Sequence, residues 1–261
     1  MTFFSTFNSP KHPVAVVVPV YREEVTLYER IALEQCLKVL KDHPIFMIAP
    51  EGLSLDVFRL KMNCPTLTFP SQYFTSISGY NRLMLSPEFY RTFLEFQYIL
   101  IYQLDSFVFS DQLSDWCESS YDYVGAPWIG LNRREEVKGL LPPWERKDAL
   151  RHLLNLEISN VGNGGFSLRK VRSFYRLSIL LKGVIRTWPR NEDIFWSFAA
   201  PCYYPLFKKP DIQQAISFAF ELNPRQAFEL NQNQLPFGCH GWWKYDFSFW
   251  EQTIRNLGYN W

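Results

Sequence analysis

The segment "VAVVVPVYRE", residues 14–23, decides the class of fold that this sequence predicts. It begins as a run of β-branched residues with almost no polar side chain. A strand with solvent on one face alternates apolar and polar residues, whereas a strand buried on both faces, as in a parallel sheet, is apolar throughout. We therefore expect this segment to begin with a buried, parallel strand.

Further strands and helices alternate along the first hundred residues. The later predicted strands are "IFMIAP" (45–50), "TLTF" (66–69) and "YILIY" (98–102). The predicted helices are 27–40, 54–60 and 79–96, the last interrupted at Ser86-Pro87, where serine can cap a helix and proline can occupy its first turn. This alternation favours an α/β fold with a Rossmann-type, mostly parallel twisted sheet flanked by helices.

The second half of the chain continues without a linker. The expected elements are a helix at 110–119, a strand within 121–128, a helix near 171–181 and another from 191. The charged, proline-containing segment 129–157 is predicted to be a surface insertion and a mobile lid, because long connections are often functional loops. No repeat or low-complexity segment divides the chain, so residues 1–261 are predicted to form a single domain.

Charge and cysteine content narrow the class of protein. Lys and Arg number 27 against 26 Asp and Glu, so the basic excess of most nucleic-acid-binding proteins is missing. The five cysteines are scattered and form no C-x-x-C pair, which favours a reducing cytoplasm over a disulfide framework or a zinc knuckle. We find no signal-peptide pattern and no apolar run long enough to cross a bilayer. The sequence therefore predicts a soluble, cytoplasmic protein.

Asp105 is the first candidate site residue. It follows the predicted strand 98–102, and ligands of open α/β sheets bind outside the carboxyl ends of the strands. A strand-end Asp can also be a turn former or a helix cap. Gln103, two residues upstream, can supply a neutral oxygen, so "QLD" can form a one-carboxylate site for Mg²⁺ or Mn²⁺, which also bind substrate phosphates.

Three later features also admit two interpretations. "GNGGF" (162–166) is a tight turn or a loop whose backbone faces a sugar. "NED" (191–193) opens a helix, with Asn191 as a cap and the acids favoured by the helix dipole, or it projects an ionised carboxylate that accepts a proton from an alcohol. His240, between glycines and a Trp pair, is a structural residue or a metal ligand.

Taken in order, these features resemble those of nucleotide-sugar glycosyltransferases of the GT-A fold. In such enzymes a D-x-D-type motif and a late His bind the metal, a Gly-rich loop shapes the sugar site, and an x-E-D motif supplies the base. The chain is most similar to an uncharacterised bacterial group of GT-A-like proteins. The phrases that carry this resemblance are "VVVPVYRE", "YNRLMLS", "QLD", "YDYVGAPW", "VGNGGFSLR", "NEDIFW" and "PFGCHGW".

The resemblance implies a role for individual residues. Asp105 and His240 would bind a divalent cation, Mn²⁺ or Mg²⁺, with His240 as a neutral imidazole. Gln103 stands where the first acid of D-x-D is expected, which is a departure from the pattern. Asp193 would be the catalytic base, and its neighbour Glu192 would bind acceptor hydroxyls. The implied donor-binding residues are Pro19, Val20, Tyr21, Arg22, Gln103, Asp105, Gly164 and Gly165. By its charge, Arg82 or Arg22 is expected to pair with a donor phosphate.

The resemblance also implies a reaction. Residues 1–110 would bind the nucleotide and residues 111–261 the sugar and the acceptor. The protein would be a hexosyltransferase-like enzyme that moves a sugar, with inversion, from a nucleoside-diphosphate sugar, here expected to be a UDP-sugar, to a hydroxyl of a glycan or other acceptor. A role in bacterial surface polysaccharide biosynthesis, with peripheral membrane association, follows by analogy.

Two other functions stay open at this point. A non-catalytic glycan-binding or scaffold protein with a decayed site is favoured by Gln103. A metal-dependent nucleotidyltransferase is disfavoured, because such enzymes usually carry a basic, Gly-rich loop near the N-terminus and "PVYREE" (19–24) has no glycine.

Overall fold

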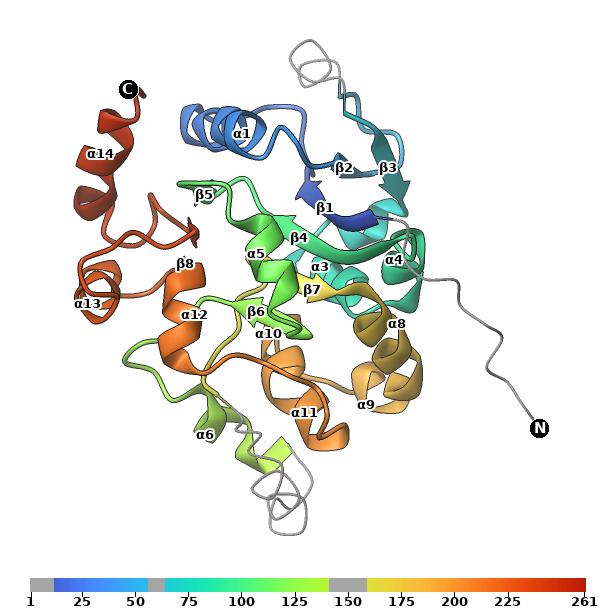
Figure 1. The fold of residues 1–261 in the computed structure, drawn as a ribbon. Coiled ribbons are helices and arrows are strands. Elements are labelled where there is room, and N and C mark those ends of the chain that lie inside the picture. The colour runs from blue at the N-terminus through green and yellow to red at the C-terminus, as the bar shows by residue number, and fades with distance from the viewer. Residues whose placement is uncertain (1–11, 56–63, 141–158) are drawn as a thin grey trace.

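The described part of the chain is organised around two β-sheets (Figure 1). The computed structural model describes residues 12–55, 64–140 and 159–261. The strands of the larger sheet are β1 (His12–Pro19), β2 (Ile45–Pro50), β3 (Thr66–Phe69), β4 (Phe96–Tyr102), β6 (Tyr123–Gly125) and β7 (Phe166–Lys170), in the order β3-β2-β1-β4-β7-β6. The first four of these in spatial order pair in parallel, whereas β7 is antiparallel to both β4 and β6. The predicted mostly parallel α/β sheet in a single domain is therefore confirmed.

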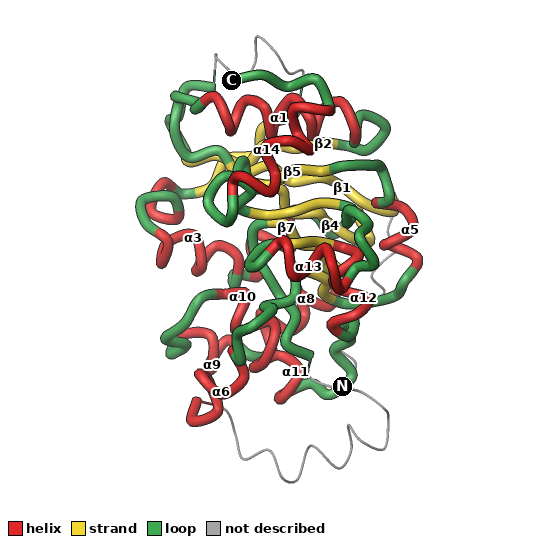
Figure 2. The backbone as a smooth tube through the Cα atoms, turned by 90° about the vertical axis from the view of Figure 1, so that its left-hand side faces the viewer, coloured by secondary structure: helices red, strands yellow, loops and turns green. Residues whose placement is uncertain are grey.

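Helices cover both faces of the larger sheet (Figure 2). The α-helices are α1 (Leu27–Val39), α3 (Ile77–Met84), α4 (Pro87–Thr92), α5 (Leu113–Glu118), α6 (Arg133–Val137), α8 (Val171–Leu180), α9 (Lys182–Arg186), α10 (Glu192–Ile194), α11 (Ala200–Tyr203), α12 (Ile212–Phe218), α13 (Pro224–Leu230) and α14 (Phe247–Asn256). A π-helical turn (Phe195–Ala199) joins α10 to α11, and short 3₁₀ helices lie at Ser71–Tyr73 and Lys138–Leu140.

Strand β1 has no polar face because both of its faces are buried. Val14, Val16 and Val18 lie in one core with residues of α1, α5 and α12. Ala15 and Val17 lie in a second core on the opposite face with residues of α3, α4 and α8. At about 25 cal/mol per Å² of apolar surface, burial on both faces makes this strand a large contributor to folding. The continuous apolar run in the sequence reports this two-sided packing.

The predicted helix interruption at Ser86-Pro87 is confirmed. The Ser86 hydroxyl accepts a hydrogen bond from the backbone N–H of Phe89 at 3.2 Å, and Pro87 occupies the first turn of α4, where its missing N–H costs nothing. The predicted helix at 54–60 and most of the predicted lid at 129–157 lie outside the described residues. The described start of that insertion forms α6 and a 3₁₀ turn.

The smaller sheet brings the end of the chain back to strand β4. Its strands are β5 (Ser106–Val108), β9 (Gly238–His240) and β8 (Ala219–Phe220), in that spatial order. β5 pairs antiparallel with β9, and the register places Ser106 opposite His240. β8 pairs in parallel with β9, with Phe220 beside Cys239. Because β5 directly follows β4, this pairing carries His240 to the carboxyl end of the main sheet.

Candidate active site

A cleft of about 860 Å³ opens at the carboxyl ends of β1 and β4. This is the edge at which open α/β sheets bind ligands. Its lining comes from the ends of these two strands, from the loop before β7, from the start of α10 and from the C-terminal segment. The predicted site residues in the lining are Pro19, Tyr21, Arg22, Gln103, Asp105, Gly164, Gly165, Glu192, Asp193 and His240.

Two predicted site residues lie elsewhere. Val20 is buried in the core beneath the cleft, with 1% of its surface exposed. Arg82 is not among the residues that line the cleft, and its guanidinium donates to the Ser78 hydroxyl within α3. Arg22 does line the cleft, but its Nη2 contacts both carboxylate oxygens of Glu29, at 2.7 and 2.6 Å. The guanidinium of Arg22 is therefore held in place by an acid before any phosphate approaches.

Asp105 lies at the centre of a polar cluster. Its carboxylate accepts a hydrogen bond from Lys244 Nζ at 2.5 Å, and its other oxygen, Oδ1, lies 3.2 Å from His240 Nε2. Its backbone carbonyl also accepts hydrogen bonds from the N–H groups of Gly241 and Trp242. The side chain of Gln103 joins the cluster, with Oε1 at 3.2 Å from the same His240 nitrogen. One carboxylate, one amide and one imidazole thus converge on a single point.

The charges in this cluster shift each other's pKa. Burial acts to raise the pKa of Asp105, but the neighbouring cations of His240 and Lys244 hold it well below its usual range. Burial acts to lower the pKa of His240, but the carboxylates of Asp105 and Glu221 raise it to about 10. His240 is therefore an imidazolium at neutral pH in this arrangement, whereas the resemblance implied a neutral ring. A metal ligand must lose this proton from Nε2.

The glycines of the loop before β7 are required by close packing. A Cβ atom at position 165 would overlap Nε2 of His240 and crowd Oε1 of Gln103, and one at position 164 would overlap a carboxylate oxygen of Glu192. Neither residue has a positive φ. The sequence suggested that glycine here gives a substrate access to the backbone. The structure shows that the missing side chains at 164 and 165 also let Glu192 and His240 pack directly against this loop.

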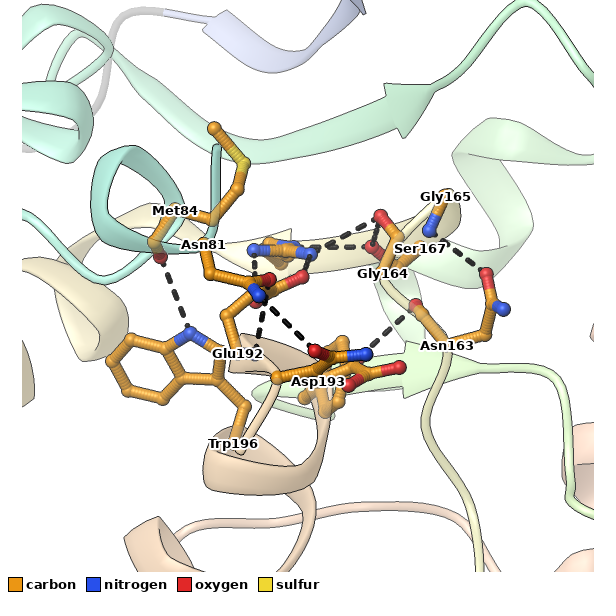
Figure 3. A network of polar contacts seen from close by, with 12 residues as sticks. Asn81, Met84, Asn163, Gly164, Gly165, Ser167, Glu192, Asp193 and Trp196 are labelled. Atoms are coloured by element: carbon orange, nitrogen blue, oxygen red, sulfur yellow. Dashed lines mark hydrogen bonds and ion pairs between the residues drawn. The ribbon is translucent and has the colours of Figure 1, made fainter. Parts of the chain in front are cut away.

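Glu192 is bound by a buried arginine that sequence reasoning did not single out. Arg169 Nη1 and Nη2 donate to the two carboxylate oxygens of Glu192 at 3.0 and 2.8 Å. Figure 3 shows the labelled Glu192 within this network of polar contacts. The side chains of Arg169 and Glu192 are 0% and 3% exposed. Arg169 also donates to the hydroxyls of Tyr90 and Ser167 and to the carbonyl of Gly164. This network ties the start of α10 to the glycine loop.

Asp193 lies at the cleft without a cationic partner in direct contact among the described residues. Its Oδ1 accepts a hydrogen bond from the backbone N–H of Ile194 at 2.7 Å. Burial raises its pKa to about 7, the negative charge of Glu192 adds to this rise, and the Ile194 N–H and Arg169 oppose it. The sequence predicted a carboxylate of ordinary pKa that the helix dipole keeps ionised. Desolvation, the largest cause of the shift, outweighs the dipole of the helical segment that begins here.

Three further residues of the cleft were not predicted as site residues, although Asn163 lies within the "GNGGF" segment (162–166). Glu221, Asn163 and Lys244 all line the cleft. Lys244 lies in the turn after β9, four residues after His240, and no motif in the sequence marked it. Nothing in the sequence around Glu221 marked it as part of a site.

The donor atoms at Asp105 fit a divalent cation. Within the described ranges, no group of three or more His, Cys, Asp and Glu side chains is arranged to hold a metal. The set that converges here instead combines a carboxylate oxygen of Asp105, the amide oxygen of Gln103 and Nε2 of His240. Mn²⁺ and Mg²⁺ accept this mixed set and fill their remaining positions with water or phosphate oxygens.

Comparison with solved structures defines the class of fold. The galactosyltransferase LgtC, in complex with donor and acceptor sugar analogs, superposes with a TM-score of 0.53 at 14% identity, over 93% of this chain and 94% of that chain. Mouse xyloside xylosyltransferase 1 superposes with a TM-score of 0.51 at 12% identity, over 89% of this chain and 98% of that chain. The fold is that of the GT-A glycosyltransferases.

Comparison of the sequence with protein-family models identifies one family. The family described as "Protein of unknown function (DUF5672)" matches residues 63–240, and the chain belongs to it. No curated protein matches the chain. Among the described helices, none has the length and apolar character needed to cross a membrane.

Proposed function

We propose that this protein is a glycosyltransferase that moves a sugar from a nucleoside-diphosphate sugar to an acceptor hydroxyl. One observation carries the proposal. Asp105, Gln103, His240 and Lys244 converge at the sheet edge of a GT-A fold, beside a cleft of about 860 Å³ that also contains Asp193. Such a cleft is large enough for a nucleotide sugar, since small-molecule sites span roughly 300–1,000 Å³.

The cluster around Asp105 supports a site for the donor diphosphate. Asp105, Gln103 and His240 would hold a divalent cation, which would stabilise negative charge on the departing diphosphate. Lys244 Nζ, with its side chain 54% exposed, lies beside Asp105 and can turn to a phosphate oxygen. Arg22, which is paired with Glu29, is a further guanidinium in the lining of the cleft.

Asp193 supports the acceptor half of the reaction. With a pKa of about 7, it is ionised in a large fraction of molecules at neutral pH and remains basic enough to accept a proton. In the proposed step the acceptor oxygen forms a bond to the anomeric carbon, its proton passes to Asp193, and the bond from that carbon to the diphosphate breaks, with the electron pair leaving on the diphosphate. Both carboxylate oxygens of Glu192 accept hydrogen bonds from the buried Arg169, so we assign Glu192 to the positioning of Asp193 and not to acceptor binding.

This single displacement predicts inversion at the anomeric carbon. NMR of the product distinguishes the outcomes, and retention of the donor configuration would remove Asp193 from the role of base. We further propose a glycan as the acceptor, in bacterial surface polysaccharide synthesis, and a UDP-sugar as the donor. The aromatic rim formed by Tyr21, Trp243 and Tyr245 supports binding of ring-shaped ligands.

A thermal-shift screen of nucleoside diphosphates and their sugars, with and without Mn²⁺, tests the proposal. A ligand that binds the native state at 100 times its Kd stabilises it by about 2.7 kcal/mol. We expect one nucleotide class to raise the melting temperature, more strongly with Mn²⁺, and its sugar derivative to be turned over on a matching acceptor. A protein that binds none of these ligands would instead be a non-catalytic member of the fold.

A further inference from the structure

Three residues that are far apart in the chain lie in one row at the end of the smaller sheet. The antiparallel register of β5 and β9 places Ser106, the neighbour of Asp105, opposite His240. The parallel register of β8 and β9 pairs Phe220 with Cys239, so the next residue, Glu221, comes to lie beside His240. His240 therefore lies between two carboxylates, Asp105 on one side and Glu221 on the other.

The two ring nitrogens of His240 have different surroundings. Nδ1 lies 3.0 Å from Glu221 Oε1 and 3.1 Å from Asn163 Nδ2, whose N–H is also directed to Glu221 Oε1. Nε2 lies 3.2 Å both from Asp105 Oδ1 and from Gln103 Oε1. Glu221 is only 8% exposed, so the contact at Nδ1 is shielded from water. A carboxylate accepts but does not donate when ionised, so the contact with Glu221 places a proton on Nδ1. Nε2 then faces the proposed cation site.

Asn163 fixes Glu221 from the other side. Its Nδ2 donates to Glu221 Oε1 at 2.5 Å, so the same oxygen receives both the amide and the imidazole. Its Oδ1 accepts hydrogen bonds from the backbone N–H groups of Gly165 and Phe166, at 2.8 and 3.0 Å. Since a side chain at position 165 would collide with His240, the loop, Asn163, Glu221 and His240 form one connected unit.

We propose that Glu221 is a positioning residue that orients His240 toward a divalent cation, with Asn163 holding Glu221 in place. This inference rests on the proposed metal-dependent glycosyltransferase function. Histidine ligands commonly donate their second ring N–H to a carboxylate, which fixes the ring and makes the ligating nitrogen more basic. Glu221 supplies such a carboxylate here, and no sequence motif marked it.

Metal affinity tests this role directly, without the need for turnover. The full-length protein, the Glu221→Gln variant and the Glu229→Gln variant are titrated with Mn²⁺, and free Mn²⁺ is followed by EPR. Glu229 is exposed on α13 of the same C-terminal region and serves as the matched control. Removal of such a supporting contact weakens metal binding by roughly 10- to 100-fold. We expect that loss for Glu221→Gln, and the affinity of the unmodified protein for Glu229→Gln.

The melting temperature without metal accompanies each titration, so that a folding defect is recognised. If Glu221→Gln does not fold, Glu221→Asp replaces it, because it keeps the charge but withdraws the oxygens from Nδ1, and the same weakening is expected. A folded Glu221→Gln protein that binds Mn²⁺ as tightly as the unmodified protein overturns the role of Glu221 and leaves the proposed function intact. An unmodified protein that binds no Mn²⁺ overturns both this role and the metal dependence of the proposed reaction.

Discussion

Two acid-containing clusters flank the glycine loop, and they differ in burial and in saturation. In the buried cluster, both oxygens of Glu192 are bound by Arg169, and the side chains are 0% and 3% exposed. In the open cluster, Asp105 and His240 are 10% and 14% exposed, and Lys244 is 54% exposed. In the buried cluster all five N–H donors of Arg169 are engaged by protein groups. The open cluster keeps donor atoms and a movable cation at the cleft.

The comparison teaches that neighbouring acids of one motif can have separate tasks. Glu192 and Asp193 are adjacent, but Glu192 faces Arg169, whereas the direct partner of the Asp193 carboxylate within the described part of the chain is the Ile194 N–H. A buried ion pair holds its two side chains in fixed positions, because breaking the pair would leave an uncompensated charge in the protein interior. A carboxylate of raised pKa is available for proton transfer. The following predictions test this division, beginning with the largest expected effect.

Glu192→Gln should strongly destabilise the protein, because it leaves the fully buried guanidinium of Arg169 without a counter-charge. Removal of one partner of a buried pair costs about 3–5 kcal/mol, which urea denaturation measures. Arg225→Met is the control, because its partner Asp246 forms an exposed pair that contributes about 0–1 kcal/mol. Equal stability of the two variants would show that burial does not distinguish these pairs.

Asp105→Asn should abolish sugar transfer while the fold is kept. Because the amide cannot provide the negative charge that a cation needs, we expect turnover to fall by about 10³-fold, or about 4 kcal/mol in the barrier. The backbone contacts of Asp105 with Gly241 and Trp242 persist, so the far-UV spectrum should be unchanged. Asp115→Asn, an exposed site in α5, should leave turnover intact. Full turnover in Asp105→Asn would exclude the open cluster from the reaction.

Gly165→Ala should separate His240 from Gln103, since the new methyl group overlaps one side chain and crowds the other. A misplacement of about 1 Å can cost about 10²-fold in rate, so we expect kcat/KM to fall by about that factor. Gly183→Ala in α9, where a Cβ atom meets nothing within 4 Å, should leave kcat/KM unchanged. If both alanine variants are fully active, the close approach at position 165 has no functional role.

The pH dependence of kcat/KM should follow the ionisation of the Asp193 carboxyl group. Because the base must be ionised, kcat/KM should rise about tenfold per pH unit below about 7 and then level off. Initial rates measured between pH 5 and 9 give this pH profile of kcat/KM. Asp193→Asn should remove most of the activity. If the residual activity of this variant still rises with pH up to about 7, the titrating group is another residue.

The carboxyl group of Asp193 should also make the stability of the folded protein depend on pH. Whereas kcat/KM rises with pH, the contribution of Asp193 to stability should fall. The pKa of Asp193 rises from 3.8 in the unfolded chain to about 7 in the folded protein, so the folded state binds more protons between these values. The contribution of Asp193 is therefore full below about pH 4 and is lost as the pH rises to about 7. Urea denaturation at pH 5 and pH 8 should show a smaller difference for Asp193→Asn than for the unmodified protein.

Lys244→Met should have the smallest effect. An exposed cation contributes about 1 kcal/mol or less to an ion pair, so KM for the donor should rise several-fold with little change in kcat. The dependence of KM on salt should also weaken. Loss of activity as large as that of Asp105→Asn would place Lys244 in the reaction itself and would remove the distinction between a fixed acid and a movable cation.

Sequence reasoning found much of the open cluster and little of the buried one. Asp105 was found because a charge directly after an apolar strand needs a partner, and His240 was found through the resemblance to GT-A enzymes. Arg169 was missed because it sits within "FSLRK", an ordinary strand sequence, and its ion pair forms across 23 residues. Glu221 was missed because it follows a two-residue strand that gives no periodic signal.

The sequence by itself determined the class of fold. The apolar run at β1 and the alternating strands and helices define a mostly parallel sheet, because periodicity reports which faces are buried. It also determined that a carboxylate stands at the end of β4. Only the tertiary structure decided which groups meet that carboxylate. The row Asp105–His240–Glu221 depends on the register of β9 with β5 and with β8. β5 lies more than a hundred positions before the other two strands, and no local pattern encodes such a register.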